Sequence, residues 1–82
     1  MKKMKKEEFI ENLKDALEIE DEDREITAGT NLKDLEEYDS LSVLSIIAMI
    51  DKNFGKQIPS IDFIKITTIK SLMELIGKEY FQ

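Results

Sequence analysis

Helical periodicity is the feature that most limits what this chain can fold into. In three segments of its 82 residues, apolar side chains return every three or four positions, as they do along one face of a helix. No segment shows the sustained alternation of apolar and polar residues that marks a half-buried strand. The spacing therefore predicts an all-α fold, a small four-helix bundle made of three main helices and a short third helix.

Capping and breaking residues set the expected ends of these helices. Asp39 or Ser40 is suited to begin the second main helix, and Gly55 supplies its stop. Thr67 or Thr68 is suited to cap the last helix, whose apolar pattern reaches Tyr80. The predicted helices span about 5–18, 39 or 40 to 54, 60–65, and 67 or 68 to 80.

The second main helix is apolar over most of its circumference, so it is expected either at the centre of the fold or facing a partner. Its predicted core stripe consists of Val43, Leu44, Ile47, Ile50 and Phe54. Ile46 and Ala48 are expected between the two faces, with Ser42, Ser45 and Met49 on the outer side. In the long acidic connection before this helix, roughly 19–38, Leu32 and Leu35 are the expected anchors to the core.

The composition excludes several kinds of chemistry. The chain has no cysteine and no histidine, so it lacks a thiol nucleophile, a zinc-thiolate site and the usual general base. A serine in this chain cannot belong to a Ser-His-Asp triad. The acidic run 20–25 lacks the residue order of an EF-hand, and we expect no metal site there. We therefore expect a protein that is not an enzyme and has no catalytic residues.

Size and charge narrow the class further. At 82 residues, 1–82 is expected to be a single domain. The formal net charge is −6, which disfavours binding to nucleic acid and to anionic membranes. The longest apolar run, 41–50, is too short to span a bilayer, and no signal peptide is recognisable. These features predict a cytoplasmic, soluble monomer without membrane insertion.

The tripeptide Asp39-Ser40-Leu41 stands where the acidic connection gives way to the apolar helix. A serine at a helix start lies beside free N–H groups and partial positive charge, so a phosphate ester on its hydroxyl is well placed. The simpler interpretation is that Asp39 or Ser40 is only a helix cap. The tripeptide alone does not decide between a modification site and a cap.

The order of motifs after this point resembles the acyl carrier protein family. Asp39-Ser40-Leu41 is followed by an apolar helix ending in Phe54-Gly55, then by Ile58-Pro59, and then by the stretch 65–69. Each motif alone is weak, but together, in this order and spacing, they are specific. The resemblance covers the second half almost without gaps, and the first helix and long loop agree in length and character.

The resemblance implies a carrier whose Ser40 holds 4′-phosphopantetheine, attached from coenzyme A by a phosphopantetheinyl transferase. Acyl groups would be attached to the thiol of this arm as thioesters, which suits a chain that has no cysteine of its own. Asp39 would help hold the transferase's magnesium during loading. The resemblance and the acidic loop together give partner-binding residues Leu41, Met49, Glu36 and Glu37, and an acyl cavity lined by Leu44, Ile47, Ile58 and Ile66.

The sequence departs from the fatty-acid branch of that family. Ser42, Ser45 and Lys52 stand where acids are expected along the second helix, and acids gather instead in the loop before it. The aromatic Tyr38 before the motif looks more like specialised carriers, including those for D-alanine. Three functions stay open: a carrier for fatty-acid or specialised acyl synthesis, an aminoacyl or peptidyl carrier, and an unmodified helical docking module. The expected partners are acyl- or aminoacyl-transferring enzymes.

Overall fold

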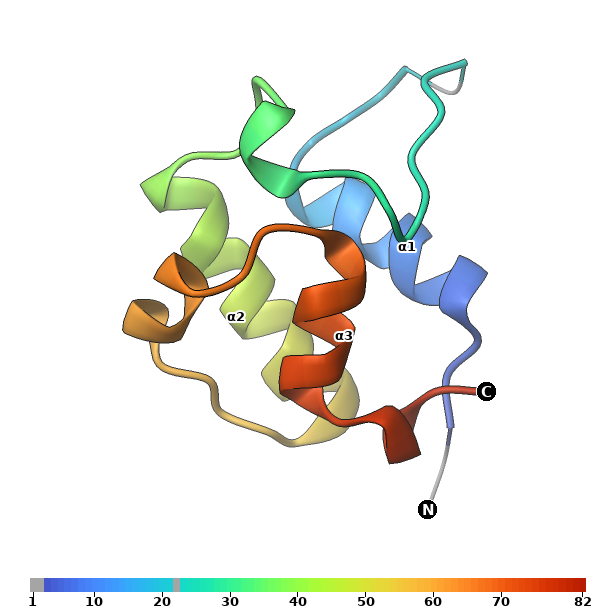
Figure 1. Cartoon of the computed structure of the whole chain (residues 1–82), viewed down its shortest axis with the longest axis vertical. Helices are drawn as coiled ribbons and strands as arrows, with labels where there is room; N and C mark the ends of the chain where they lie inside the picture. The colour runs from blue at the N-terminus through green and yellow to red at the C-terminus, as the bar shows by residue number, and fades with distance from the viewer. Residues whose placement is uncertain (1–2, 22) are drawn as a thin grey trace.

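The computed structural model describes residues 3–21 and 23–82, which form three α-helices joined by loops and 3-10 turns (Figure 1). No strand forms within these described residues. The predicted all-α fold is confirmed, and the short third helix is present as a 3-10 turn. The elements are α1 (Lys6–Ala16), η1 (Leu32–Asp34), α2 (Ser40–Phe54), η2 (Ser60–Ile64), α3 (Ile69–Ile76) and η3 (Lys78–Tyr80).

Side-chain caps fix where α2 and α3 begin. The Ser42 N–H donates to Asp39 Oδ1 at 2.8 Å, and the Asp39 N–H donates to Ser42 Oγ at 2.7 Å. Thr68 and Ser71 make the same reciprocal pair at the start of α3. Of the two candidates named for each helix, Asp39 and Thr68 are therefore the caps. Gly55 ends α2 as predicted, with a left-handed φ of 65° that costs glycine little.

The last helix is shorter than the sequence predicts. α3 ends at Ile76 because Gly77, with φ at 128°, takes the chain out of helical geometry. Tyr80 lies in η3 and stacks edge-on against Phe54, with ring centroids 5.5 Å apart. Lys56 donates to the Ile76 carbonyl at the end of α3, which satisfies a group without a helical partner. The prediction that the helix reaches Tyr80 is wrong. The apolar spacing continues past Gly77, but this glycine ends the helix.

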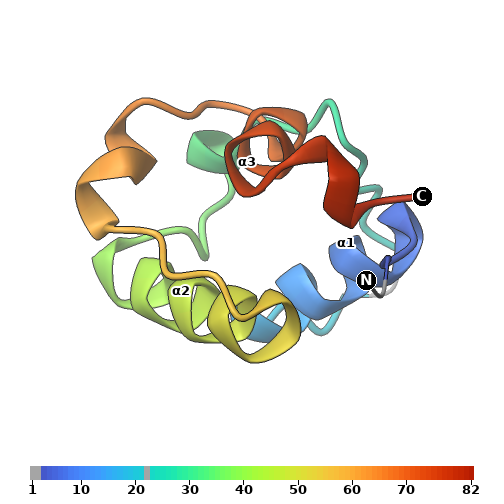
Figure 2. The ribbon, with the colours of Figure 1, turned by 90° about the horizontal axis from the view of Figure 1, so that it is seen from below.

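The core lies where the three α-helices face one another (Figure 2). Of the large side chains that are fully buried, α3 supplies three and α1 and α2 supply two each, while η1 adds one anchor from the long connection. Burial of each large apolar side chain contributes about 1.5–3 kcal/mol to folding, so this set dominates the stability of so small a domain. The large side chains that are fully buried are Phe9, Leu13, Leu32, Ile46, Ile50, Ile69, Leu72 and Ile76.

α2 is rotated relative to the predicted core stripe. Its buried side chains are Ser42, Ile46 and Ile50, which lie four residues apart on one ridge. Leu44, a predicted core residue, is 59% exposed, whereas Ile46 is fully buried. The other predicted members of the stripe flank the ridge and are half-buried: Val43, Ile47 and Phe54. Because α2 is apolar nearly all round, its pattern did not determine which side faces inward. The capping bonds also let Ser42 be buried at no polar cost.

The long connection between α1 and α2 is held against the start of α3. The Leu32 N–H donates to the Thr67 carbonyl at 2.8 Å, and the Ile69 N–H donates to the Thr30 carbonyl at 3.0 Å. Leu32 is buried at this junction and Leu35 packs half-buried against the core, so both predicted anchors are confirmed. These contacts fix the connection that leads to Asp39 and so help to place the start of α2.

Candidate functional site

Ser40 is exposed in the first turn of α2, directly after the cap. The N–H groups of a helix's first turn lack intrahelical carbonyl partners, and the helix dipole adds partial positive charge at this end. A phosphate ester on the Ser40 hydroxyl would therefore lie in water beside a favourable electrostatic environment. The structure thus gives Ser40 both the access and the surroundings that a phosphate-linked modification requires.

The capping bonds distinguish Ser40 from the other serines of α2. Ser42 is buried, and its hydroxyl both accepts from the Asp39 N–H and donates to the Asp39 carbonyl at 2.8 Å. Ser45 is exposed but lies beyond the first turn, where backbone N–H groups already have helical partners. Among these three serines, only Ser40 combines exposure with a position at the helix start.

Asp39 holds the backbone that carries Ser40. Its Oδ1 accepts the bond from Ser42, and the carboxylate itself is exposed. The side chain therefore has one oxygen engaged in capping while its charge faces solvent next to the Ser40 hydroxyl. This arrangement lets Asp39 serve as a cap and as a ligand for a cation brought by a partner.

The capping hydrogen bond and the charge of the Asp39 side chain can be separated by substitution. Asp39→Ala is expected to lower the free energy of unfolding by about 1 kcal/mol, because the cap acceptor is lost. Asp39→Asn keeps an acceptor of similar capping strength, so it is expected to lower the free energy of unfolding by only a few tenths of the loss in Asp39→Ala. Urea denaturation of both variants measures this difference. Equal losses would show that the carboxylate charge, not the hydrogen bond, stabilises the helix start.

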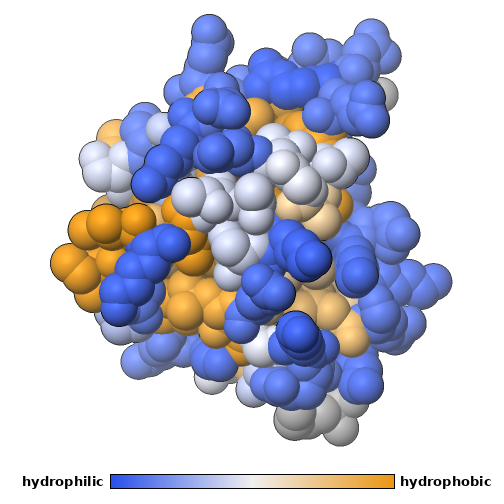
Figure 3. Space-filling view, viewed as in Figure 1, coloured by the Kyte–Doolittle hydropathy of each residue, from blue (hydrophilic) through white to orange (hydrophobic). Residues whose placement is uncertain are grey.

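Large apolar side chains are exposed on α2 and η2. Leu41 is 75% exposed, directly after Ser40, and Leu44 is 59% exposed one turn further. Ile61 and Ile64 on η2 are 63% and 68% exposed, and η2 packs beside α2. Figure 3 shows an apolar area on the side of the molecule where η2 lies. These four residues, the exposed apolar surface, are the kind of feature that marks an interaction site.

Ile61 and Ile64 were not among the site residues predicted from the sequence. A signal was present, because a 3-10 turn eclipses residues three apart and places these two isoleucines on one side. Phe63 takes the buried side of η2, which leaves the isoleucines outside. Met49, a predicted partner-binding residue, is by contrast half-buried and packs against the core.

An open groove of about 580 Å³ runs between α2 and the segment 57–60. Leu44, Ile47 and Ile58, three residues of the predicted acyl cavity, line it together. Ile66, the fourth, is buried in the core and is not among the residues that line the groove. The structure therefore brings three of the four side chains to one apolar hollow on the flank of α2.

An ion pair lies in the loop that leads to Ser40. Arg24 Nη1 lies 2.7 Å and 2.8 Å from the two carboxylate oxygens of Glu37, and it is the sole ion pair among the described residues. The hydrogen bond from Arg24 lowers the pKa of Glu37 and raises that of the arginine. Glu37, predicted to meet partners, is thus already paired within the chain, while Glu36 is exposed. Arg24 is the chain's single arginine, and this was the signal in the sequence that could have drawn attention to it.

This pairing predicts a pH dependence. A carboxylate whose pKa is lowered in the folded state adds stability above its unfolded pKa, and this stability is lost as pH falls through the lowered value. Removing the cation by Arg24→Gln should return the pKa of Glu37 toward its ordinary 4.5. A carbon-13 NMR titration of the glutamate carboxyls measures it, with Lys33→Gln as the control. An unchanged titration of Glu37 in Arg24→Gln would contradict the assignment.

Two features are absent from the described residues. Residues 3–21 and 23–82 contain no cluster of three or more potential metal-ligating side chains. No helix in the same part of the chain is long and apolar enough to cross a membrane.

A comparison with protein families bears directly on this site. The profile described as a phosphopantetheine attachment site matches residues 7–76, which contain most of α1, all of α2 with Ser40, and all of α3. No curated protein and no solved structure matches the chain. Proteins of the matched family hold covalently attached 4′-phosphopantetheine and are in general carriers without catalytic activity. With its helical fold and a match over most of its length, the chain belongs to the phosphopantetheine-attachment family of carrier proteins.

Proposed function

We propose that this carrier presents acyl groups as thioesters on a 4′-phosphopantetheine arm attached to Ser40. The observation that carries the proposal is the exposure of Ser40 at the start of α2, within the matched region, while its neighbour Ser42 is buried and bonded. A phosphopantetheinyl transferase adds the arm from coenzyme A. The Ser40 oxygen loses its proton and attacks the phosphorus next to the pantetheine, so the pyrophosphate bond of coenzyme A breaks, adenosine 3′,5′-bisphosphate leaves, and a phosphodiester forms. The arm supplies the thiol that this cysteine-free chain lacks.

Asp39 assists the loading reaction in this proposal. Its exposed carboxylate lies next to Ser40, and carboxylate oxygens are ligands that magnesium prefers. The transferase's magnesium would be held in part by this side chain while the arm is transferred. Loading of Asp39→Asn should therefore be slower than loading of the unchanged protein, even though the helix cap remains.

Partner enzymes dock beside the arm, on the exposed apolar surface. Leu41 is the most exposed of its four residues and directly follows Ser40. Glu36 adds an exposed charge, whereas Glu37 is neutralised by Arg24 and Met49 is half-buried, so we assign these two the smaller contributions. The partners we propose are the transferase and enzymes that transfer acyl or aminoacyl groups.

A docking surface of this composition predicts a mild dependence on salt. The apolar contacts do not weaken as the Debye length shortens from about 10 Å at 0.1 M salt to about 3 Å at 1 M. We expect kcat/KM for loading to fall only mildly over this range of salt. The substitution Leu41→Ala should lower kcat/KM more than Glu36→Gln does. Initial rates of phosphopantetheine transfer measure both effects. A steep loss of rate with salt would instead indicate long-range electrostatic steering.

The cargo is carried, not transformed. A flexible tether keeps a bound group at an effective concentration on the order of mM near its partner, which is the physical advantage of a carrier. The groove formed by Leu44, Ile47 and Ile58, with Ile66 in the adjoining core, is our proposed shelter for an acyl chain. The proposed setting is the cytoplasm, in fatty-acid or specialised acyl synthesis, with the carrier as a monomer that binds no nucleic acid.

An aminoacyl or peptidyl cargo is the second candidate, and one observation favours it. Tyr38 directly precedes the motif, as in specialised carriers such as the D-alanyl type, and it is half-buried against the core. The acyl group recovered from the arm in cells distinguishes the two candidates. An unmodified docking module is the third, and it predicts that no arm is found.

The test is the intact mass of the protein before and after incubation with coenzyme A and a broad-specificity transferase. A gain of one phosphopantetheine supports the proposal, and the loaded arm can then be examined for cargo. No gain, with the protein folded and the transferase active on a control carrier, would favour the unmodified docking module.

A further inference from the structure

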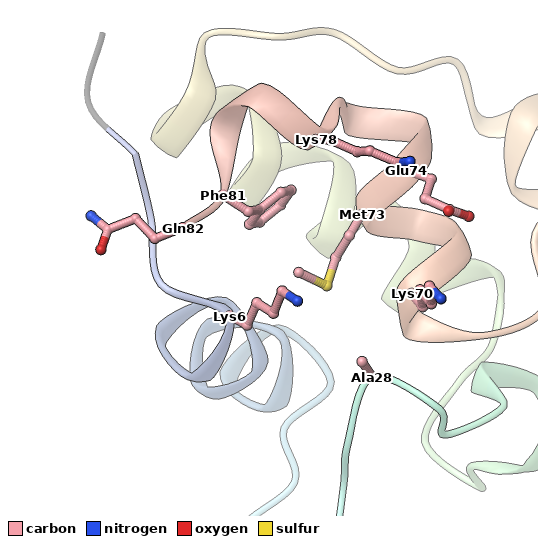
Figure 4. Close-up of a pocket in the computed structure, with 8 residues that line it drawn as sticks. All are labelled: Lys6, Ala28, Lys70, Met73, Glu74, Lys78, Phe81 and Gln82. Carbon is pink, nitrogen blue, oxygen red and sulfur yellow. The ribbon is translucent and has the colours of Figure 1, made fainter.

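A groove of about 450 Å³ opens between α1, α3 and the C-terminal segment (Figure 4). Met73 and Phe81 form its apolar floor, and both are buried from most of the solvent. The wall is braced by backbone pairing, because the Met4 N–H donates to the Tyr80 carbonyl at 2.9 Å and the Gln82 N–H donates to the Met4 carbonyl at 3.0 Å. The groove is therefore a formed feature of the fold.

The rim of this groove is positively charged in an acidic protein. Lys6 approaches from α1, Lys70 lies in the first turn of α3 and Lys78 begins η3, against one acid, Glu74 (Figure 4). The chain as a whole has a formal net charge of −6, so this local excess of cations opposes the overall balance. The sole ion pair among residues 3–21 and 23–82 joins Arg24 and Glu37, so none of the three lysines is paired there. An anionic occupant would complement this rim.

The lysines and the apolar floor together indicate the chemistry of that occupant. The lysines come from three elements, α1, α3 and η3, around the floor formed by Met73 and Phe81. A free phosphate or carboxylate has no apolar part to cover that floor. In an extended peptide, residues two apart point to the same side, so two acids can flank an apolar side chain on one face. Such a segment would present its acids to the lysine rim and its apolar side chain to the floor.

We propose that this groove docks an extended acidic segment of a partner protein with the pattern acidic–x–apolar–x–acidic. The apolar side chain covers Met73 and Phe81, and the two acids meet the rim formed by Lys6, Lys70 and Lys78. The groove lies beside the C-terminal segment, away from the start of α2 (Figure 1). A partner held there leaves Ser40 accessible, and a second contact raises overall affinity through effective concentration. Docking at this groove does not depend on the modification of Ser40.

The test is an NMR titration of the nitrogen-15-labelled full chain with the peptide acetyl-Glu-Ser-Leu-Ser-Glu-amide. We expect amide shifts at Lys6, Lys70 and Met73 and none across 40–44, with a Kd in the millimolar range or tighter. The neutral peptide acetyl-Gln-Ser-Leu-Ser-Gln-amide should bind at least tenfold more weakly. Its binding with equal affinity would overturn the proposal, since the rim would then have no role.

Charge-reversal variants test the site itself. The double variant Lys70→Glu with Lys78→Glu should weaken binding of the acidic peptide at least tenfold. The control, Lys33→Glu with Lys65→Glu, makes the same change in net charge at exposed lysines outside the groove and should change the Kd less than twofold. Equal weakening by both pairs would overturn the proposal in favour of non-specific attraction. So would groove shifts caused by decanoate alone at the same affinity, or by self-association of the chain without peptide.

Discussion

Ser40→Ala is expected to abolish the gain of one phosphopantetheine that the unchanged protein shows with coenzyme A and a transferase. The hydroxyl oxygen of Ser40 is the atom through which the arm is attached, and alanine offers no substitute. The effect is all-or-none, so intact mass spectrometry reads it directly. The variant should remain folded, because an exposed side chain in the first turn contributes less than about 0.5 kcal/mol and the capping bonds between Asp39 and Ser42 are untouched.

Ser45→Ala is the matched control for this experiment. Ser45 is exposed on the same helix, so its replacement removes an equivalent hydroxyl without altering the helix start. We expect full loading of Ser45→Ala. A mass gain that persists in Ser40→Ala and disappears in Ser45→Ala would move the attachment site along α2 and contradict the proposal. A gain that persists in both would show modification elsewhere.

The position of Ser40 could be predicted because the relevant information is local. A cap residue, a serine and the onset of an apolar helix are adjacent in the sequence, and the structure places them as a helix start with its caps formed. The absence of cysteine and histidine removed competing chemistries. The bounds of α1 and α2 followed from spacing and from Gly55 for the same reason. Each of these features depends on residues within a few positions of one another.

The features that could not be predicted depend on contacts between distant residues. Arg24 and Glu37 are thirteen residues apart, and nothing in either local pattern indicates that they meet. The lysine-rimmed groove joins Lys6 to Lys78, which only the packing of α1 against the C-terminal segment brings together. Ile66 belongs to the predicted acyl cavity by sequence position, yet the fold buries it apart from the groove that Leu44 and Ile58 line.

The orientation of α2 is the clearest case of such a limit, and it supplies the second large prediction. Ile46→Ala should lower the free energy of unfolding by about 2–5 kcal/mol, because the side chain is fully buried and its removal leaves a cavity. Leu44→Ala, two residues away on the same helix, should cost less than about 0.5 kcal/mol, because Leu44 is mostly exposed. Both changes produce the same residue in the same helix, so differences in helix propensity are small.

For a domain of this size, a total stability of about 4–12 kcal/mol is expected from about 0.05–0.15 kcal/mol per residue. The loss at Ile46 is therefore a large fraction of the whole, and Tm should fall by about 4–8 °C for each kcal/mol. Urea denaturation and thermal melts of the two variants measure the contrast. The stripe predicted from sequence alone makes the opposite prediction, with Leu44 in the core and Ile46 at its margin. If Leu44→Ala proved the more destabilising variant, α2 would be rotated toward that stripe, and Leu44 would leave the exposed apolar surface beside Ser40.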